Sequence, residues 1–219
     1  MQHENLKEVV IRDILEHSEY LKDIGKLHEA ISFLEVELQK SFNLQFLARL
    51  TNFYILIEDN HKYQKGIKEL YAKDQTFTGL FLNQARYLLA KRQVSELSEF
   101  INTNLSHFAD NPEGIILHGV CLKLLGNIDA SMERLSSVLE KDPENVNAKI
   151  NLGLIAIDQN QYELASIYLL ECFDAKPHQK SIWPLILKAL DKMGNYNIAF
   201  DFLSKVTSKN SSNTKYIQK

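Results

Sequence analysis

The sequence has few of the residues that make loops and reactive sites. Its 219 residues include eight glycines, four prolines and two cysteines. No glycines fall in a GxGxxG or GxxxxGK arrangement, so the sequence predicts no phosphate-cradling loop and no nucleotide cofactor. The two cysteines have no CxxC spacing, and the seven histidines are scattered without an HExxH pair. These absences argue against a disulfide framework and against a metal site.

An excess of either charge is also absent. Twenty-five basic residues stand against 28 acidic ones, a net charge of -3, so no global basic field points to nucleic acid. The first residues are polar, and no apolar stretch is long enough for a membrane span, so we expect no secretory signal and no membrane insertion. Cys121 and Cys172 lie inside apolar helical patterns, which indicates buried free thiols in a reducing compartment. We therefore expect a cytoplasmic protein.

No group of residues has the pattern of a catalytic site. Glu16, Glu19 and Asp23 belong to a solvated helix face, so no carboxylate pair stands out for acid–base chemistry. His118 occupies a core-like position, where a partly buried histidine is expected more often than a metal ligand. The basic run at 62–73 has the spacing of an exposed helix face, with a contact to a phosphate or to an acidic partner as the alternative. We expect no enzyme activity, no cofactor and no metal.

A regular repeat is the main positive feature of the sequence. Pro143 and Pro177 are 34 residues apart, and the same interval of 34 residues separates Leu135, Leu169 and Leu203 in turn. Apolar residues between these points recur at helical spacing, and no strand alternation competes with it. A fixed period of this length, about 34 residues, is typical of stacked helix hairpins.

A small residue in the second helix of each unit serves as an anchor for the repeat. Six anchors divide the chain, and their numbers differ in turn by 36, 31, 34, 34 and 34: Ala30, Gly66, Leu97, Ser131, Ala165 and Ala199. Residues that tolerate a left-handed backbone precede several anchors and predict the end of the first helix: Gly25, Gly126, Asn160 and Gly194. A large residue such as Leu97 at an anchor should push neighbouring helices apart.

These residues resemble the tetratricopeptide repeat family. Its pattern is matched in part by Leu152, Gly153, Tyr162, Ala165 and Pro177. The resemblance is specific over 112–207, good over 11–43 and weak over 44–111. It implies an all-α, right-handed superhelical solenoid of about six antiparallel helix hairpins over residues 1–207. The units would lie near 11–43, 44–77, 78–111, 112–145, 146–179 and 180–207, followed by a polar tail or linker at 208–219.

The family framework also implies a concave groove lined by the first helices. In this sequence its lining would be mostly apolar, with amides and single charges: Leu82, Asn83, Arg86, Ile116, Leu117, Val120, Asn147, Ile150, Asn151, Leu154, Ile157, Leu185 and Lys188. An exposed apolar stripe normally marks an interface, unless another part of the chain covers it. We expect the groove to bind a peptide or helix of a partner protein.

One known mode of binding is not supported. Relatives that grip the acidic tails of heat-shock chaperones use lysine and arginine in a two-carboxylate clamp. Asn151 would suit the middle of such a clamp, but Val120 before it and Leu185 after it stand where the cations are needed. We therefore expect no binding of these tails.

Several functions remain open at this point. The first is a scaffold that binds a protein partner. The second is an N-terminal recognition arm of a larger enzyme, such as a transferase, and the third is a helical-repeat RNA binder, which the charge balance disfavours. The last second helix, near 198–203, has apolar residues and no following amphipathic helix, so it should be covered by a homodimer contact or a partner segment, or else stay exposed.

Overall fold

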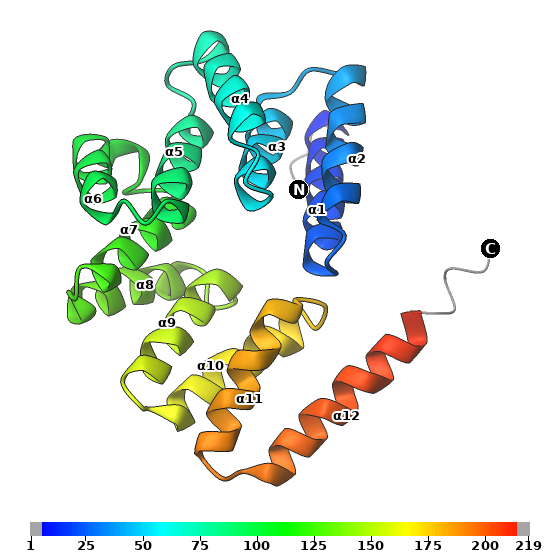
Figure 1. The fold of residues 1–219 in the computed structure, drawn as a ribbon, viewed down its shortest axis with the longest axis vertical. Coiled ribbons are helices and arrows are strands. Elements are labelled where there is room, and N and C mark those ends of the chain that lie inside the picture. Colours follow the sequence, from blue (N-terminus) through cyan, green and yellow to red (C-terminus); the bar gives the residue numbers. More distant parts are fainter. Residues whose placement is uncertain (1–5, 214–219) are drawn as a thin grey trace. The chain divides into compact units, whose positions relative to one another are not determined.

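The protein is built from helix hairpins (Figure 1). The computed structural model describes the backbone of residues 6–213 and the side chains of residues 7–206. In this part of the chain there are twelve α-helices, two short 3-10 turns at Leu105–His107 and Lys180–Ile182, and no strand. The hairpins are α1(Leu6–Asp23)/α2(Leu27–Lys40), α3(Leu44–Leu56)/α4(Asn60–Lys73), α5(Thr78–Ala90)/α6(Val94–Thr103), α7(Pro112–Leu124)/α8(Ile128–Lys141), α9(Val146–Asp158)/α10(Tyr162–Ala175) and α11(Trp183–Lys192)/α12(Tyr196–Asn213). The all-α helical-repeat prediction is confirmed.

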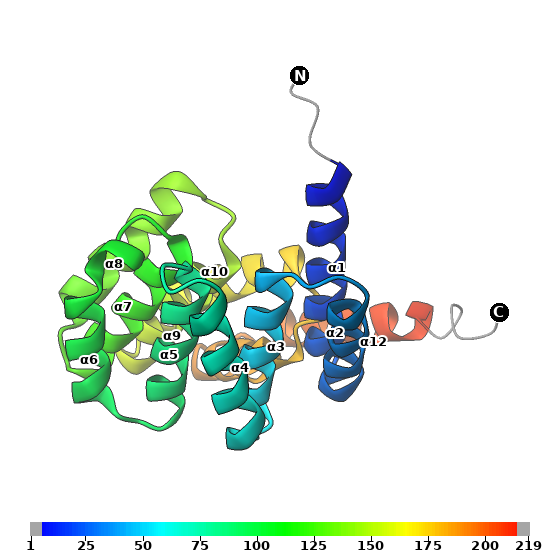
Figure 2. The ribbon, with the colours of Figure 1, turned by 90° about the horizontal axis from the view of Figure 1, so that it is seen from above.

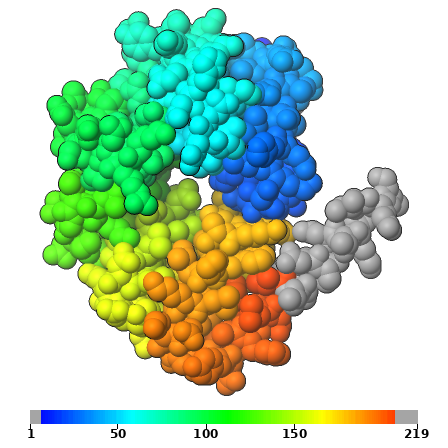
Figure 3. All heavy atoms as spheres, viewed as in Figure 1, coloured from blue at the N-terminus to red at the C-terminus, as the bar shows by residue number. Residues whose placement is uncertain are grey.

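The chain divides into two compact units. Unit 1 extends to Arg134 and unit 2 starts at Leu135, so the boundary lies inside α8. In unit 1 the successive hairpins lie side by side, and Figures 2 and 3 show them in order from blue through cyan to green. One solenoid over residues 1–207 stays a prediction.

The start of several helices is fixed by a side-chain cap. The Oδ1 atoms of Asn43, Asn111 and Asn145 accept hydrogen bonds from backbone N–H groups of the first turns of α3, α7 and α9. Asp59 does the same for α4 through Lys62 N–H, at 2.9 Å. Such caps stabilise a helix by about 1 kcal/mol each, and they place the junctions between hairpins.

Every hairpin turns through one residue with a left-handed backbone. The six corner residues have φ between 57° and 86°: Gly25, Glu58, Arg92, Gly126, Asn160 and Gly194. Each first helix ends with the same two backbone hydrogen bonds, as in Gly126 N–H to Lys123 O and Asn127 N–H to Leu122 O. These are the bonds of a Schellman motif, which satisfies carbonyls at a helix end. The sequence predicted four of these corners, and Glu58 and Arg92 complete the set.

The positions of the corners correct the repeat register expected for the second hairpin, α3/α4. Tyr63 is the fourth residue of α4, just as Ala30 is the fourth residue of α2 and Leu97 of α6. The anchor at Gly66 is therefore wrong, and the true spacings are 33 and 34 rather than 36 and 31. Tyr63 is buried and its ring stacks on Tyr87, with centroids 4.3 Å apart. Gly66 is small for another reason, since a Cβ there would collide with the Thr51 side chain of α3.

The core forms where each second helix packs on the first helix of the next hairpin. The pairs α2/α3, α4/α5 and α6/α7 make such contacts in unit 1, and α10/α11 does so in unit 2. Four residues at equivalent positions in the second helices have no exposed surface: Leu34, Ile101, Leu135 and Leu169. Burying a leucine or isoleucine side chain stabilises by about 1.5–3 kcal/mol, so these positions hold successive hairpins together.

The last helix is longer than expected. The backbone of α12 is helical to Asn213, which includes the first part of the tail predicted at 208–219. No Pro or Gly interrupts the sequence after Gly194, and a polar run without these residues can continue a helix. Residues 214–219 lie outside the described part. None of the described helices has both the length and the hydropathy needed to cross a membrane.

The corner residues allow a direct test of backbone strain. A Cβ added at Gly126 would meet no atom within 4 Å, so Gly126→Ala changes only backbone preference. We expect it to lower the free energy of unfolding by about 1 kcal/mol. Arg92→Gly should instead raise it, by up to about 1 kcal/mol, because the exposed Arg92 already bears the left-handed penalty. Urea unfolding measures both, and a loss of stability in Arg92→Gly equal to that in Gly126→Ala would contradict this account.

Candidate functional site: a polar groove on the first helices of unit 1

A continuous groove runs over the first helices of unit 1. One part lies between α1 and α3, and the other extends over α3, α5 and the start of α7. Leu15, Gln45 and Arg49 line both parts, so the two are joined. Its polar lining consists of charges of both signs and amides: Glu8, Arg12, Glu16, Glu19, Gln45, Arg49, Asn52, Asn83, Arg86, Asn111 and Glu113. We call this surface the polar groove.

Helical spacing brings the charged residues of α1 to the polar groove. Glu8, Arg12, Glu16 and Glu19 recur at three- and four-residue steps, which places them on one side of a helix. The apolar Ile14 is partly buried and packs into the core of unit 1 instead. The amphipathic pattern of α1 therefore fixes which side lines the groove and which side faces the core.

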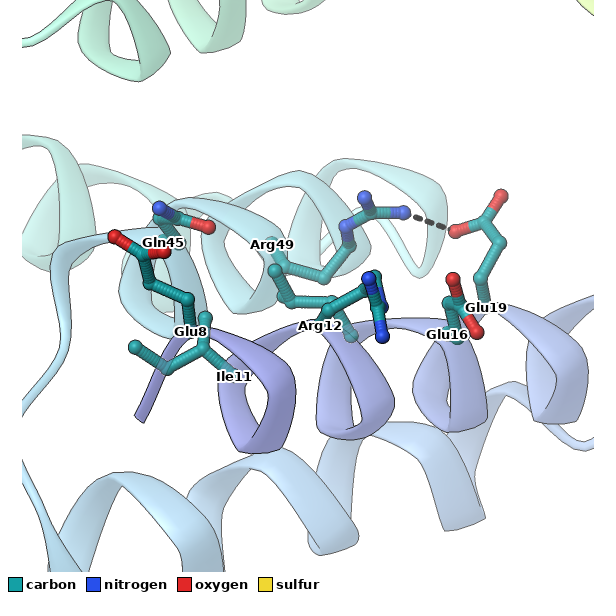
Figure 4. Close-up of a pocket in the computed structure, with 8 residues that line it drawn as sticks. Glu8, Ile11, Arg12, Glu16, Glu19, Gln45 and Arg49 are labelled. Carbon is teal, nitrogen blue, oxygen red and sulfur yellow. Dashed lines mark hydrogen bonds and ion pairs between the residues drawn. The ribbon is translucent and has the colours of Figure 1, made fainter. Parts of the chain in front are cut away.

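An ion pair closes one end of the groove between α1 and α3. In Figure 4 the Arg49 guanidinium extends from α3 to the Glu19 carboxylate on α1, and the two groups form a salt bridge. The same carboxylate also pairs with Lys22. Glu8 and Gln45 lie at the opposite end of this view. Because Arg49 and Glu19 are each only about a third exposed or less, the pair is held on a partly dry surface.

A second ion pair bridges α5 and α7. The Arg86 guanidinium contacts the Glu113 carboxylate, and Arg86 is 20% exposed while Glu113 is 49% exposed. Beside it, the Asn83 amide donates hydrogen bonds to the carbonyls of Ala48 and Gly79, both at 3.0 Å. Asn83 itself has no exposed surface, so it joins α3 to α5 beneath the groove.

Several pKa shifts in unit 1 belong to packing outside the groove. Burial raises the pKa of the Tyr54 hydroxyl, and its hydrogen bond to Glu35, at 2.9 Å, acts in the same direction. Burial acts to raise the pKa of Glu35, but hydrogen bonds from Lys62 and Tyr54 outweigh it and lower that pKa. Burial also lowers the pKa of the half-buried His118, with help from Arg134. The Glu35–Tyr54–Lys62 network ties α2, α3 and α4 together.

The chemistry of the polar groove is that of a binding surface. Arginine side chains can donate two parallel hydrogen bonds, glutamates accept hydrogen bonds, and amides do both. Among the described residues no three His, Cys, Asp or Glu side chains are grouped to hold a metal ion. The two cysteines are free and buried, and burial raises the pKa of the Cys172 thiol to about 11.

The residues predicted to line a groove are spread over both units. Five of them are buried inside their own unit: Leu82, Asn83, Ile116, Leu117 and Ile157. Six are half-buried: Arg86, Val120, Ile150, Asn151, Leu154 and Leu185. Asn147 and Lys188 are exposed. Leu82, Asn83 and Arg86 line the polar groove, whereas the residues on α9 and α11 belong to unit 2 and their groove stays a prediction.

The sequence analysis names no groove-lining residue before Leu82, although the repeat relates residues of the first two hairpins to Asn83 and Arg86. Arg49 and Glu16 are the equivalents of Asn83 in the two preceding hairpins. Asn52 and Glu19 are likewise the equivalents of Arg86. All four line the polar groove. The misplaced anchor at Gly66 shifts the register of the second hairpin only, which concerns Arg49 and Asn52.

The buried position of Asn83 predicts a structural role. Asn83→Ala removes both hydrogen bonds to the α3 and α5 backbone, so we expect the free energy of unfolding to fall by about 2 kcal/mol. Asn147→Ala, at an exposed position of α9, is the control and should change stability by less than about 0.5 kcal/mol. Chemical unfolding of both variants measures the difference, and equal stabilities would contradict the structural role of Asn83.

Comparisons with known proteins agree with this architecture. The family model described as Tetratricopeptide repeat matches residues 146–179, which hold α9 and α10. The curated Protein CTR9 homolog of Arabidopsis thaliana is 28% identical over 116 residues, which are 52% of this chain and 10% of that protein. The chain thus spans about a tenth of the length of this relative.

Solved structures share the fold at low identity. TTC0263, a thermophilic TPR protein of Thermus thermophilus, is 14% identical with a TM-score of 0.64, covering 82% of this chain and 98% of that one. Human IFIT1, in a dimer with PPP-AAAA, is 16% identical with a TM-score of 0.65, covering 83% of this chain and 45% of that one. A tetratricopeptide repeat protein from Parabacteroides merdae ATCC 43184 is 15% identical with a TM-score of 0.54, covering 90% and 78%.

These likenesses concern the fold, and the fold is one that presents extended surfaces to protein partners. Residues 146–179 match the tetratricopeptide repeat model, and the six hairpins with their repeated corners have the fold of tetratricopeptide repeat proteins.

Proposed function

We propose that the protein is a non-catalytic scaffold that binds an extended peptide segment of a partner protein in the polar groove. The observation that carries this proposal is the unbroken run of charged and amide side chains over four first helices. The partner segment would carry charges of both signs, because arginines and glutamates alternate along the groove. Apolar side chains, such as Ile11, Leu15 and Leu82, also line the groove and can contact the apolar parts of such a segment.

The dimensions of the groove favour an extended occupant. Neighbouring helices pack about 8–10 Å apart, so four first helices span roughly 25–30 Å. An extended chain rises about 3.3 Å per residue, so roughly eight residues fit along the groove. A peptide backbone has a donor and an acceptor at every residue, and amides such as Gln45 and Asn52 can bind both. A purely apolar helix would leave these polar groups without partners.

A selection experiment tests the proposal while the partner is unidentified. Random twelve-residue peptides displayed on phage would be selected on the full chain, and we expect enriched peptides with charges of both signs. Glu16→Ala and Asn52→Ala should each weaken binding of these peptides about tenfold, because both residues line the groove.

Lys68→Ala, at an exposed position of α4 away from the groove, is the matched control and should bind as the wild type does. Enriched peptides that bind the groove variants and the wild type equally would contradict the proposal. The same would follow if no related peptides were enriched. Calorimetric titration of single synthetic peptides gives the dissociation constants for this comparison.

A further inference from the structure

One side of α12 presents large apolar side chains to solvent. Tyr196, Phe200 and Leu203 are 68%, 71% and 45% exposed, and their spacing of four and three residues places them on the same side of the helix. We call these three residues the α12 end face. A surface with two aromatic residues and a leucine in one row marks an interaction site.

The repeat shows what kind of surface this is. Leu203 follows its anchor Ala199 by four residues, as Leu34, Ile101 and Leu169 follow theirs, and these three equivalents have no exposed surface. They are buried because the first helix of the next hairpin covers them, as in α2/α3, α6/α7 and α10/α11. The α12 end face therefore has the side chains of a helix-docking surface, and α11, which precedes it in the same hairpin, packs on another side of α12.

The outer side of α1 differs in its side chains from the equivalent side of α3. In α3 the residues that face the preceding hairpin are Phe46, Leu50 and Phe53, which are at most 3% exposed. At the equivalent positions of α1, one repeat earlier, stand Asp13, His17 and Tyr20. The Asp13 side chain is 66% exposed and His17 is also exposed. The outer side of α1 thus has a carboxylate and an imidazole where α3 has buried apolar side chains, beside Val10 and Tyr20, which are 51% and 42% exposed.

This polarity decides between two modes of self-association. Stacking the α12 end face on α1 of a second copy would remove the Asp13 carboxylate from water, and its contact with Arg12 Nε, at 4.0 Å, is too long to compensate for that loss. Two copies of the α12 end face have no such conflict. Among the described residues, the exposed side chains that flank this row, Asn197 and Ser204, are uncharged, whereas the exposed Asp201 and Lys205 lie farther around the helix.

We propose that the α12 end face docks on the same face of a second copy of this chain, in an isologous dimer centred on Phe200. The surface is distinct from the polar groove, which lies in the other unit. A helix of another protein, or of additional repeats, is the competing occupant.

Sedimentation velocity of the full chain over a range of concentrations tests the dimer. We expect a reversible monomer–dimer equilibrium that Phe200→Asp weakens at least about tenfold, because it places a charge at the centre of the contact. Tyr71→Asp on α4 is the matched control, since Tyr71 is 53% exposed and lies on another surface, and its dimer should be unchanged. A strict monomer at millimolar concentration, or a dimer unaffected by Phe200→Asp, would overturn the proposal.

Cysteine cross-linking tests the symmetry. Phe200→Cys alone should form a covalent dimer under mild oxidation, since the native Cys121 and Cys172 are buried and do not compete. A mixture with His17→Cys should give no cross-link between the two variants. Mixed products or longer oligomers would show head-to-tail stacking and would refute the isologous arrangement. Circular dichroism checks that these exposed substitutions leave the helices intact.

Discussion

The contact between the second helix of one hairpin and the first helix of the next is the interaction on which the rest of the structure depends. A single hairpin cannot bury its apolar residues, so its stability comes from its neighbours. Leu34, Ile101 and Leu169 are fully buried in this contact. The left-handed corner in each hairpin keeps the two helices in register, so the contact recurs at a nearly constant step along the sequence. The same geometry places the first helices of unit 1 side by side and creates the polar groove.

Much of the fold was predictable because it depends on local signals. Gly25, Gly126, Asn160 and Gly194 are residues that favour a left-handed backbone, and they marked their corners correctly. Glu58 and Arg92 gave no such signal, because neither residue type favours a left-handed backbone, although their corners have the same two backbone hydrogen bonds as the other four. Small side-chain size alone does not identify an anchor residue, because Gly66 is small for a different reason, its close approach to Thr51.

The site was harder to predict, because burial depends on the exact packing of neighbouring helices. Asn83 lines the groove, but its buried amide also joins two helix backbones, and the sequence does not indicate that role. The pairing of Arg49 with Glu19 joins residues 30 positions apart, and no sequence pattern of single helices indicates it. Once the corners set the register, however, the repeat itself locates Glu16, Arg49 and Asn52 on one surface. The proposed peptide site and the α12 end face both follow from that register.

The central claim is that coverage by the next hairpin determines the stability of each second helix. Native-state hydrogen exchange of the dilute chain tests this most directly, by comparing backbone amides in α10 and α12. Leu169 in α10 is covered, whereas Leu203 in α12 is 45% exposed. We predict that α12 amides exchange markedly faster than α10 amides when the chain is monomeric. Equal protection of the two helices would contradict the account.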